Sequence, residues 1–210
     1  MFDLTLHTLL LRLALLMPIL GVHGFALALA ARQLGDKGPA RDGRLTLNPV
    51  AHLDLLGAIG VLFLGLGWMR LLELDTRALR GGIWGVMGVV LAGMVALVFL
   101  ALAAVWALPL AAGAGSLGTA QMLGAGLALL ARLSLGFALF NALPIVPLAG
   151  GYLLQRLAPA AWAWMKPRAV WVGLALLALL ASGLPAMVIN PIVQQVLTLV
   201  SGGAGALARF

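Results

Sequence analysis

An uncharged apolar run from Ile83 to Leu110 constrains this chain more than any other feature of its sequence. The run is longer than the roughly 20 apolar residues with which a helix crosses the hydrocarbon core of a bilayer. Comparable runs occur at Leu13–Ala31, Val50–Trp68, Ala120–Leu148 and Ala169–Ile189. Because lipid offers no partners to backbone polar groups, such runs favour helices, whose hydrogen bonds are internal. We therefore predict an all-α, polytopic membrane helical bundle with five or six spans.

The composition supports a membrane protein and argues against other classes. The chain is 63% hydrophobic and only 9% charged, whereas a soluble domain has about 25% charged residues. Its net charge is +7, and its basic residues cluster between the apolar runs. We expect these residues to meet anionic membrane lipids and not nucleic acid. Cysteine is absent, which excludes disulfides and thiolate-bound zinc.

The apolar runs do not separate into smaller units, so we predict a single transmembrane domain over residues 1–210. The N-terminus has neither a basic n-region nor a cleavage motif of small residues, and we expect the first span to be retained. Proline removes a helical hydrogen bond, so we predict that Asn190-Pro191 ends the last long span. A short terminal helix from Ile192 to Val200 would then follow.

One segment carries the pattern of a known metal site. It reads Asn141-Ala142-Leu143-Pro144-Ile145-Val146-Pro147-Leu148-Ala149-Gly150-Gly151. It resembles the NxxPxxPLDGG segment of the site-2 proteases, zinc metalloproteases that cut peptides inside the membrane. In that family the Asp of the segment is a zinc ligand, and Ala149 stands at its position.

The stretch 23–68 resembles the same family in the order and spacing of its motifs. Those motifs are Leu34-Gly35-Asp36, Gly43-Arg44-Leu45-Thr46-Leu47-Asn48-Pro49, His52-Leu53-Asp54, Gly57 and Gly67-Trp68. The family's first-span motif, HExxHA, reads His23-Gly24-Phe25-Ala26-Leu27-Ala28. Residues four apart share one helix face, so two imidazoles at this spacing can bind one Zn²⁺, and the Glu between them takes a proton from the bound water.

The resemblance implies a site-2-protease-like fold whose catalytic residues are degenerate. Of the four essential side chains only His23 is present, because Gly24 supplies no base and neither Leu27 nor Ala149 supplies a metal ligand. We therefore expect no catalytic residue and no bound metal or other cofactor. The resemblance also predicts that Ala149 packs near His23 and faces Gly24 and Leu27.

Other residues have two interpretations each. His23 is either a buried remnant of the metal site or a functional imidazole. Arg132 lies well inside its span, where it either extends to the membrane surface or pairs with a carboxylate, for which Asp54 is a candidate. Asn141, with Pro144 and Pro147, belongs either to a substrate channel or to the end of a helix. The resemblance to the site-2 proteases implies the first of these two interpretations, the substrate channel.

These observations favour a catalytically inactive, site-2-protease-like integral membrane protein that binds or regulates a transmembrane substrate or partner. We expect it in a bacterial-type inner (plasma) membrane. One alternative is an active intramembrane metalloprotease with an unusual zinc site, completed by a partner subunit. Another is a small transporter or lipid-binding protein. Bound zinc would identify the first alternative, and a continuous hydrated path past Arg132 would favour the second.

Overall fold

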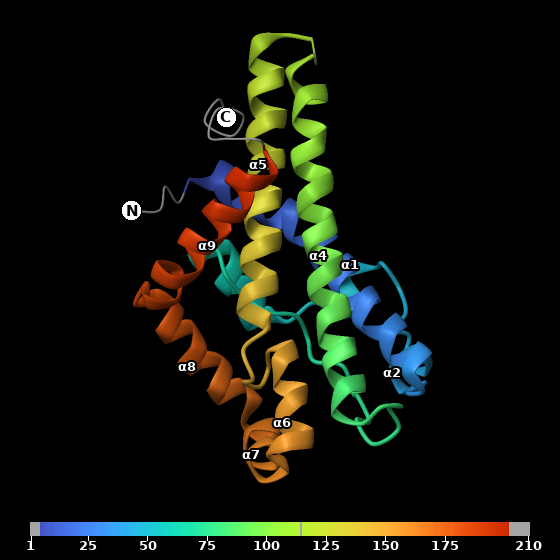
Figure 1. The fold of residues 1–210 in the computed structure, drawn as a ribbon. Helices are drawn as coiled ribbons and strands as arrows, with labels where there is room; N and C mark the ends of the chain where they lie inside the picture. Colours follow the sequence, from blue (N-terminus) through green and yellow to red (C-terminus); the bar gives the residue numbers. More distant parts are fainter. Residues whose placement is uncertain (1–4, 114, 202–210) are drawn as a thin grey trace.

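The computed structural model describes residues 5–113 and 115–201, and this part of the chain is helical without β-strands (Figure 1). Four of its helical segments are long and apolar enough to cross a membrane. They are α1 (Leu6–Leu34), α4 (Ile83–Ala112), α5 (Leu117–Asn141) and the composite segment Pro159–Ala181. The prediction of an all-α chain is confirmed, and within the described residues there are four candidate spanning helices, so five or six spans are not confirmed.

The first span is longer than its apolar run. The hydroxyl of Thr5 accepts a hydrogen bond from the backbone N–H of Thr8 and caps the start of α1. Gly35 ends the helix with a φ of 121°, a conformation that favours glycine. The last carbonyls of α1 are bound by Arg80, whose backbone N–H donates to Leu34 at 2.8 Å and whose guanidinium donates to Gln33 at 2.5 Å. A loop far along the chain is thereby fixed to the end of α1.

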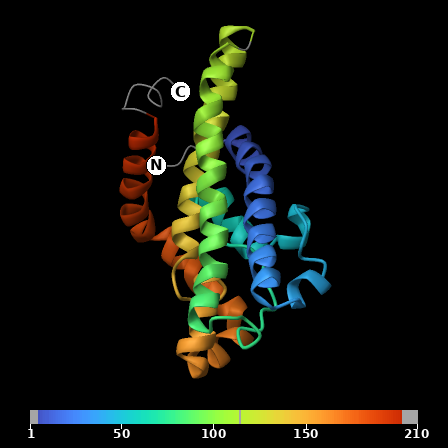
Figure 2. The ribbon, with the colours of Figure 1, turned by 45° about the vertical axis from the view of Figure 1, so that its right-hand side comes forward.

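Helices α4 and α5 form a long antiparallel hairpin at the centre of the molecule (Figures 1 and 2). Ser116 caps the start of α5 through a hydrogen bond from Thr119. The tip of the hairpin extends beyond the N-terminal end of α1 in all views. Helix α1 packs on α4, and this contact positions His23 between α1, α4 and α5.

The predicted span at Val50–Trp68 is instead a folded-back segment. It contains a 3₁₀ turn, η1 (Pro49–His52), then α3 (Leu55–Ile59) and a π-helical turn, η2 (Gly60–Leu64). The apolar helix Leu55–Leu64 is too short to cross a bilayer. The chain reverses at Gly65, which has a φ of 78° and returns past its own start. A Cβ on Gly57 would clash with the Trp68 carbonyl.

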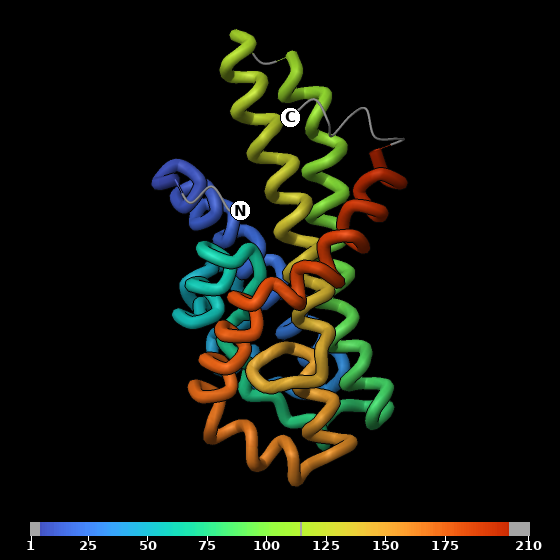
Figure 3. The backbone as a smooth tube through the Cα atoms, turned by 90° about the vertical axis from the view of Figure 1, so that its left-hand side faces the viewer, coloured from blue at the N-terminus to red at the C-terminus, as the bar shows by residue number. Residues whose placement is uncertain are grey.

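The C-terminal third wraps around the lower end of α5 and returns along its side (Figure 3). Its elements are η3 (Ala149–Gly151), α6 (Tyr152–Leu157), α7 (Pro159–Met165), η4 (Lys166–Arg168), α8 (Ala169–Ala181) and α9 (Leu184–Val200). The remaining short helix, α2 (Gly38–Arg41), lies in the loop that follows α1.

The break between the last two helices lies at a different position from the one predicted. Helix α9 continues through Asn190-Pro191, and the chain instead bends at Gly183, whose φ is 78°. Pro185 occupies the first turn of α9, where its missing N–H costs little. The left-handed glycine and the following proline are therefore a stronger interruption than a proline inside an otherwise apolar helix.

Candidate functional site

His23 lies in a closed slot between three helices. Its side chain is fully buried, and its ring meets the ring of Phe137 on α5 edge-on, with 5.4 Å between centroids. On the opposite side lies Gly93 of α4, where a Cβ would be only 2.7 Å from Cε1 of His23. Neither ring nitrogen makes a well-formed hydrogen bond to a described residue, and the nearest backbone group is that of Gly93. The imidazole is thus held mainly by packing, and the backbone of Gly93 is the polar group that acts on it.

The space beside Gly24 is filled by a second imidazole. The ring of His52, from η1, lies against Gly24 so closely that a Cβ at position 24 would be 2.5 Å from its Cε1 and closer still to its Cγ and Nδ1. The family motif places the catalytic Glu at this position. In this chain, any side chain at position 24 would need the volume that the His52 ring occupies.

The hydrogen bonding of His52 fixes its tautomer. Its Nε2 lies 2.9 Å from the carbonyl oxygen of Thr46, and a carbonyl only accepts, so Nε2 carries the proton. Its Nδ1 is then a bare acceptor, buried and without a partner in the described chain. Burial lowers the pKa of His52 below its ordinary value, the bond to Thr46 opposes this, and the charge of Arg44 adds to the lowering. His52 is therefore neutral at neutral pH.

The two remaining motif positions are apolar in their surroundings as well as in their side chains. Leu27 is fully buried, and its Cδ2 would lie 3.0 Å from a Cβ at Gly93. Ala149, in η3, is also buried, and both residues belong to one continuous hydrophobic cluster with Phe137. That Ala149 faces Gly24 and Leu27 stays a prediction.

These residues do not fit a catalytic zinc ion. Such a site uses three protein ligands and leaves one position open. Within the described residues no group of three or more His, Asp or Glu side chains comes together to hold a metal. The imidazole of His52 is close to this site, because it lies against Gly24, the residue after His23. Two imidazoles without a carboxylate or a general base do not make a hydrolase centre.

Asn141 joins the end of α5 to the folded-back segment. Its side-chain amide donates to the carbonyl oxygens of Gly67 and Phe137, each at 2.9 Å, and the residue is buried. Pro147 is also buried, whereas Pro144 is exposed. Asn141 therefore has a structural role, because it links two segments of the fold. The two prolines that the sequence analysis grouped with it differ in their burial.

An apolar groove of about 380 Å³ opens beside Pro147. Its walls come from the start of α3, the indole of Trp68 and the start of α8. The lining residues are Asp54, Leu55, Leu56, Trp68, Pro147, Ala169 and Val170. Asp54 is the one acidic residue of this lining, and its Oδ1 accepts a hydrogen bond from the backbone N–H of Gly57 at 2.8 Å. That bond caps α3.

Arg132 and Asp54, which the sequence offered as a pair, have different surroundings. Arg132 is exposed on α5 and lines a second cavity together with Arg12. The ion pair found within the described residues is a different one, between Lys166 and Glu73 at 2.6 Å. Asp54 therefore acts as a helix cap in this structure.

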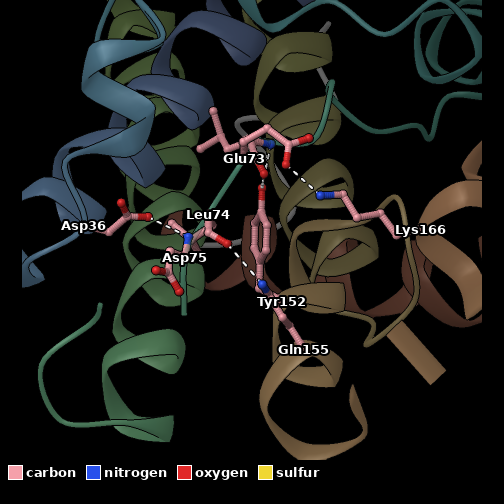
Figure 4. A network of polar contacts seen from close by, with 8 residues as sticks. Asp36, Glu73, Leu74, Asp75, Tyr152, Gln155 and Lys166 are labelled. Atoms are coloured by element: carbon pink, nitrogen blue, oxygen red, sulfur yellow. Dashed lines mark hydrogen bonds and ion pairs between the residues drawn. The ribbon is translucent and has the colours of Figure 1, made fainter. Parts of the chain in front are cut away.

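The extended segment after Trp68 is held by a polar network on α6 and η4 (Figure 4). The hydroxyl of Tyr152 accepts from the N–H of Leu72 at 2.7 Å and donates to its carbonyl at 3.1 Å. Gln155 donates to the carbonyl of Leu74, and Lys166 pairs with Glu73. These bonds occupy backbone groups that would otherwise be open to another extended chain. No sequence motif indicated this role for Tyr152.

Comparison with known proteins supports a likeness to membrane metalloproteases. The chain is 34% identical over 145 residues to the protein described as "Putative zinc metalloprotease YwhC" of Bacillus subtilis (strain 168). The match covers 66% of this chain and 64% of the length of that protein. No protein-family model matches the chain, and no solved structure matches it.

Proposed function

We propose that this chain is a site-2-protease-like integral membrane protein that does not hydrolyse peptides and that binds a transmembrane segment of another protein. The proposal treats residues 1–210 as one domain of that family and places it in a bacterial-type plasma membrane. Its support is the likeness to a protein described as a zinc metalloprotease, the four apolar helices of spanning length and the family motifs around His23 and Ala149.

The observation that carries the loss of catalysis is the position of His52. In a site-2 protease the residue after the first His is the general base, which accepts a proton from the zinc-bound water. Here that residue is Gly24, and the His52 ring fills the volume a base would need. Leu27 and Ala149 add no ligand atoms to the single imidazole of His23. The chain can therefore neither hold the metal in the family's manner nor activate a water.

The groove beside Pro147 is the proposed site for the bound segment. Its surface is mainly apolar, and Leu55 and Val170 stand exposed at its rim. An apolar helix of a membrane protein matches this surface, because its side chains lose nothing on leaving lipid and gain close packing. The bonds that Tyr152 makes to Leu72 argue against recognition by added strand pairing.

One observation favours a second candidate function. Both ring nitrogens of His23 and Nδ1 of His52 are buried, and none of them has a hydrogen bond of good geometry within the described residues. Two imidazoles could act as two ligands of a zinc ion whose third ligand came from a partner subunit. Zinc content separates this active metalloprotease from the inactive one.

The test is elemental analysis of the purified protein, expressed with added zinc and never exposed to chelators. We expect far less than one zinc per chain in the parent, in His23→Ala and in His52→Ala, with the exposed His7→Ala as a matched control. About one zinc per chain in the parent and in His7→Ala, lost in His23→Ala, would contradict the proposal and establish the second candidate.

Variants designed to gain zinc binding test the same arrangement of side chains around His23. Gly24→Glu, Leu27→His and Ala149→Asp together supply the missing base and ligands, but the His52 ring blocks position 24. We expect zinc affinity to rise by at least about tenfold when His52→Ala is added to this triple variant, since ligand orientation alone changes affinity 10–100-fold. A folded quadruple variant with the parent's affinity would show that these positions do not converge.

The groove is tested by site-specific photo-crosslinking in native membranes. A crosslinking side chain at Val170 should yield an adduct whose other half, by mass spectrometry, is an apolar transmembrane segment of a different protein. The same side chain at Leu110, equally exposed on the hairpin, is the control. Pro147→Trp fills the groove and should abolish the Val170 adduct. An adduct that survives this change would refute the proposed site.

A further inference from the structure

A second cavity, of about 220 Å³, lies between α1, the turn after η2, α5 and α9, and its polar lining is entirely cationic or amidic. Two arginines from different helices, Arg12 and Arg132, reach it, and α9 adds Asn190 and Gln194. The other lining residues within the described ranges are apolar or glycine. The cavity therefore presents many N–H donors and positive charge to whatever occupies it.

Arg12 is fixed in place. Its Nη1 donates a hydrogen bond of 2.7 Å to the carbonyl oxygen of Leu62, in the π-helical turn, and only 9% of the residue is exposed. A guanidinium has five N–H donors in a planar fork, and Arg12 has at least one further interaction besides this bond. The Leu62 contact thus holds a rigid positive group at the cavity wall.

Arg132 has a charge that its helix does not compensate. It lies in the apolar span α5, where an uncompensated charged side chain is unfavourable. It forms no hydrogen bond or ion pair with any other residue in the described ranges. An anion in the cavity would supply the missing counter-charge.

Helix α9 contributes amide hydrogen-bond donors to the same cavity. Asn190 and Gln194 are four residues apart and so lie on one side of the helix. Both are exposed, and their amides make no side-chain hydrogen bond within the part of the chain that the structure describes. Each amide can donate two N–H groups to an oxygen in the cavity.

We propose that this cavity binds a phosphate group, and that the group is the headgroup phosphate of an anionic phospholipid or free inorganic phosphate. A phosphate has tetrahedrally arranged oxygens, which suit the Arg132 guanidinium on α5 and the Asn190 and Gln194 amides on α9, arriving from different sides. Guanidinium forks bind phosphate through paired, charge-assisted hydrogen bonds. Basic pockets between membrane helices are a recurring way of holding anionic headgroups. The proposal does not depend on whether the His23 region is catalytic.

The experiment measures thermal unfolding and ligand affinity in a neutral detergent. The probes are short-chain phosphatidylglycerol, phosphatidylcholine of the same chain length, and inorganic phosphate. The variants are Arg132→Gln, Arg132→Lys and, as a matched loss of one exposed charge in a loop, Arg77→Gln. A ligand that binds the folded state raises Tm, and native mass spectrometry counts retained lipid.

We expect phosphatidylglycerol to raise Tm in the parent and in Arg77→Gln. In Arg132→Gln its dissociation constant should increase about tenfold, with Arg132→Lys in between, because lysine keeps the charge but loses the fork. Inorganic phosphate protecting as well as the lipid, with the same dependence on Arg132, would identify free phosphate as the ligand and support the site. Protection that persists in Arg132→Gln, that falls equally in Arg77→Gln, or that no probe provides in the parent would overturn it.

Discussion

Replacing Gly24 by alanine tests the contact on which the loss of catalysis rests. The new Cβ would lie 2.5 Å from Cε1 of His52, about 1 Å inside ordinary contact. Moving the ring by that much stretches its 2.9 Å bond to the Thr46 carbonyl. Overpacking of this kind costs roughly 1–3 kcal/mol, and a weakened hydrogen bond adds about 0.5–1.5 kcal/mol. Alanine regains about 0.5–1 kcal/mol in helix propensity. The net loss should be about 2 kcal/mol.

The assay is a double-mutant cycle with His52→Ala, measured by helix loss during titration of detergent-solubilised protein with a denaturing detergent. His52→Ala alone leaves a cavity and should destabilise the fold by roughly 2–4 kcal/mol. In the double variant the Cβ no longer meets a ring, so it should be about 2 kcal/mol more stable than the sum of the single effects predicts. The control is Gly126→Ala in α5, whose Cβ would have its nearest neighbour at 4.0 Å. Single effects that add within about 0.5 kcal/mol would refute the reasoning.

Three further changes have expected outcomes. Asn141→Ala removes both amide bonds described above and should destabilise the fold by roughly 1–3 kcal/mol in the same titration, more than alanine at the exposed Pro144 does. Tyr152→Phe leaves the N–H and carbonyl of Leu72 without their partner, so hydrogen exchange at Leu72 should accelerate while α1 stays protected. Because the folded pKa of His52 is lowered, the unfolded state binds more protons in mild acid, and stability should fall as pH drops below about 6.5. His52→Gln should flatten this slope relative to the parent, and an unchanged slope would exclude His52 as its source.

Two of the candidate spanning helices could be predicted from the sequence because each contains an apolar run of about the length that a span needs. The runs at Leu13–Ala31 and Ile83–Leu110 lie within α1 and α4. The run at Val50–Trp68 has similar hydrophobicity, yet it folds back. The difference comes from glycine: Gly57 meets the Trp68 carbonyl, and Gly65 has a left-handed conformation. A measure of hydrophobicity does not register these backbone contacts.

Sequence motifs could show which positions of the candidate site lack the family's catalytic side chains, but not which residues occupy the space at those positions. Sequence motifs identified Gly24, Leu27 and Ala149 as the positions that lack catalytic side chains. That His52 fills the space beside Gly24 depends on how η1 packs on α1, a tertiary contact with no local signal. A glycine at a position that usually carries a large side chain was the one available hint, since it implies room for a group from elsewhere in the chain.

The length of the central hairpin has a consequence for the surrounding bilayer. Helix α4 has 30 residues and so is about 45 Å long, against a hydrocarbon core of about 30 Å. Tilt alone would have to reach about 48° to bury it, beyond the range of roughly 0–40° that membrane helices adopt. The tip carries exposed Trp106, Leu110 and Leu117, which are poorly suited to water. The hairpin therefore favours a locally thickened bilayer, and this hydrophobic mismatch should concentrate the protein in the thicker regions of its membrane.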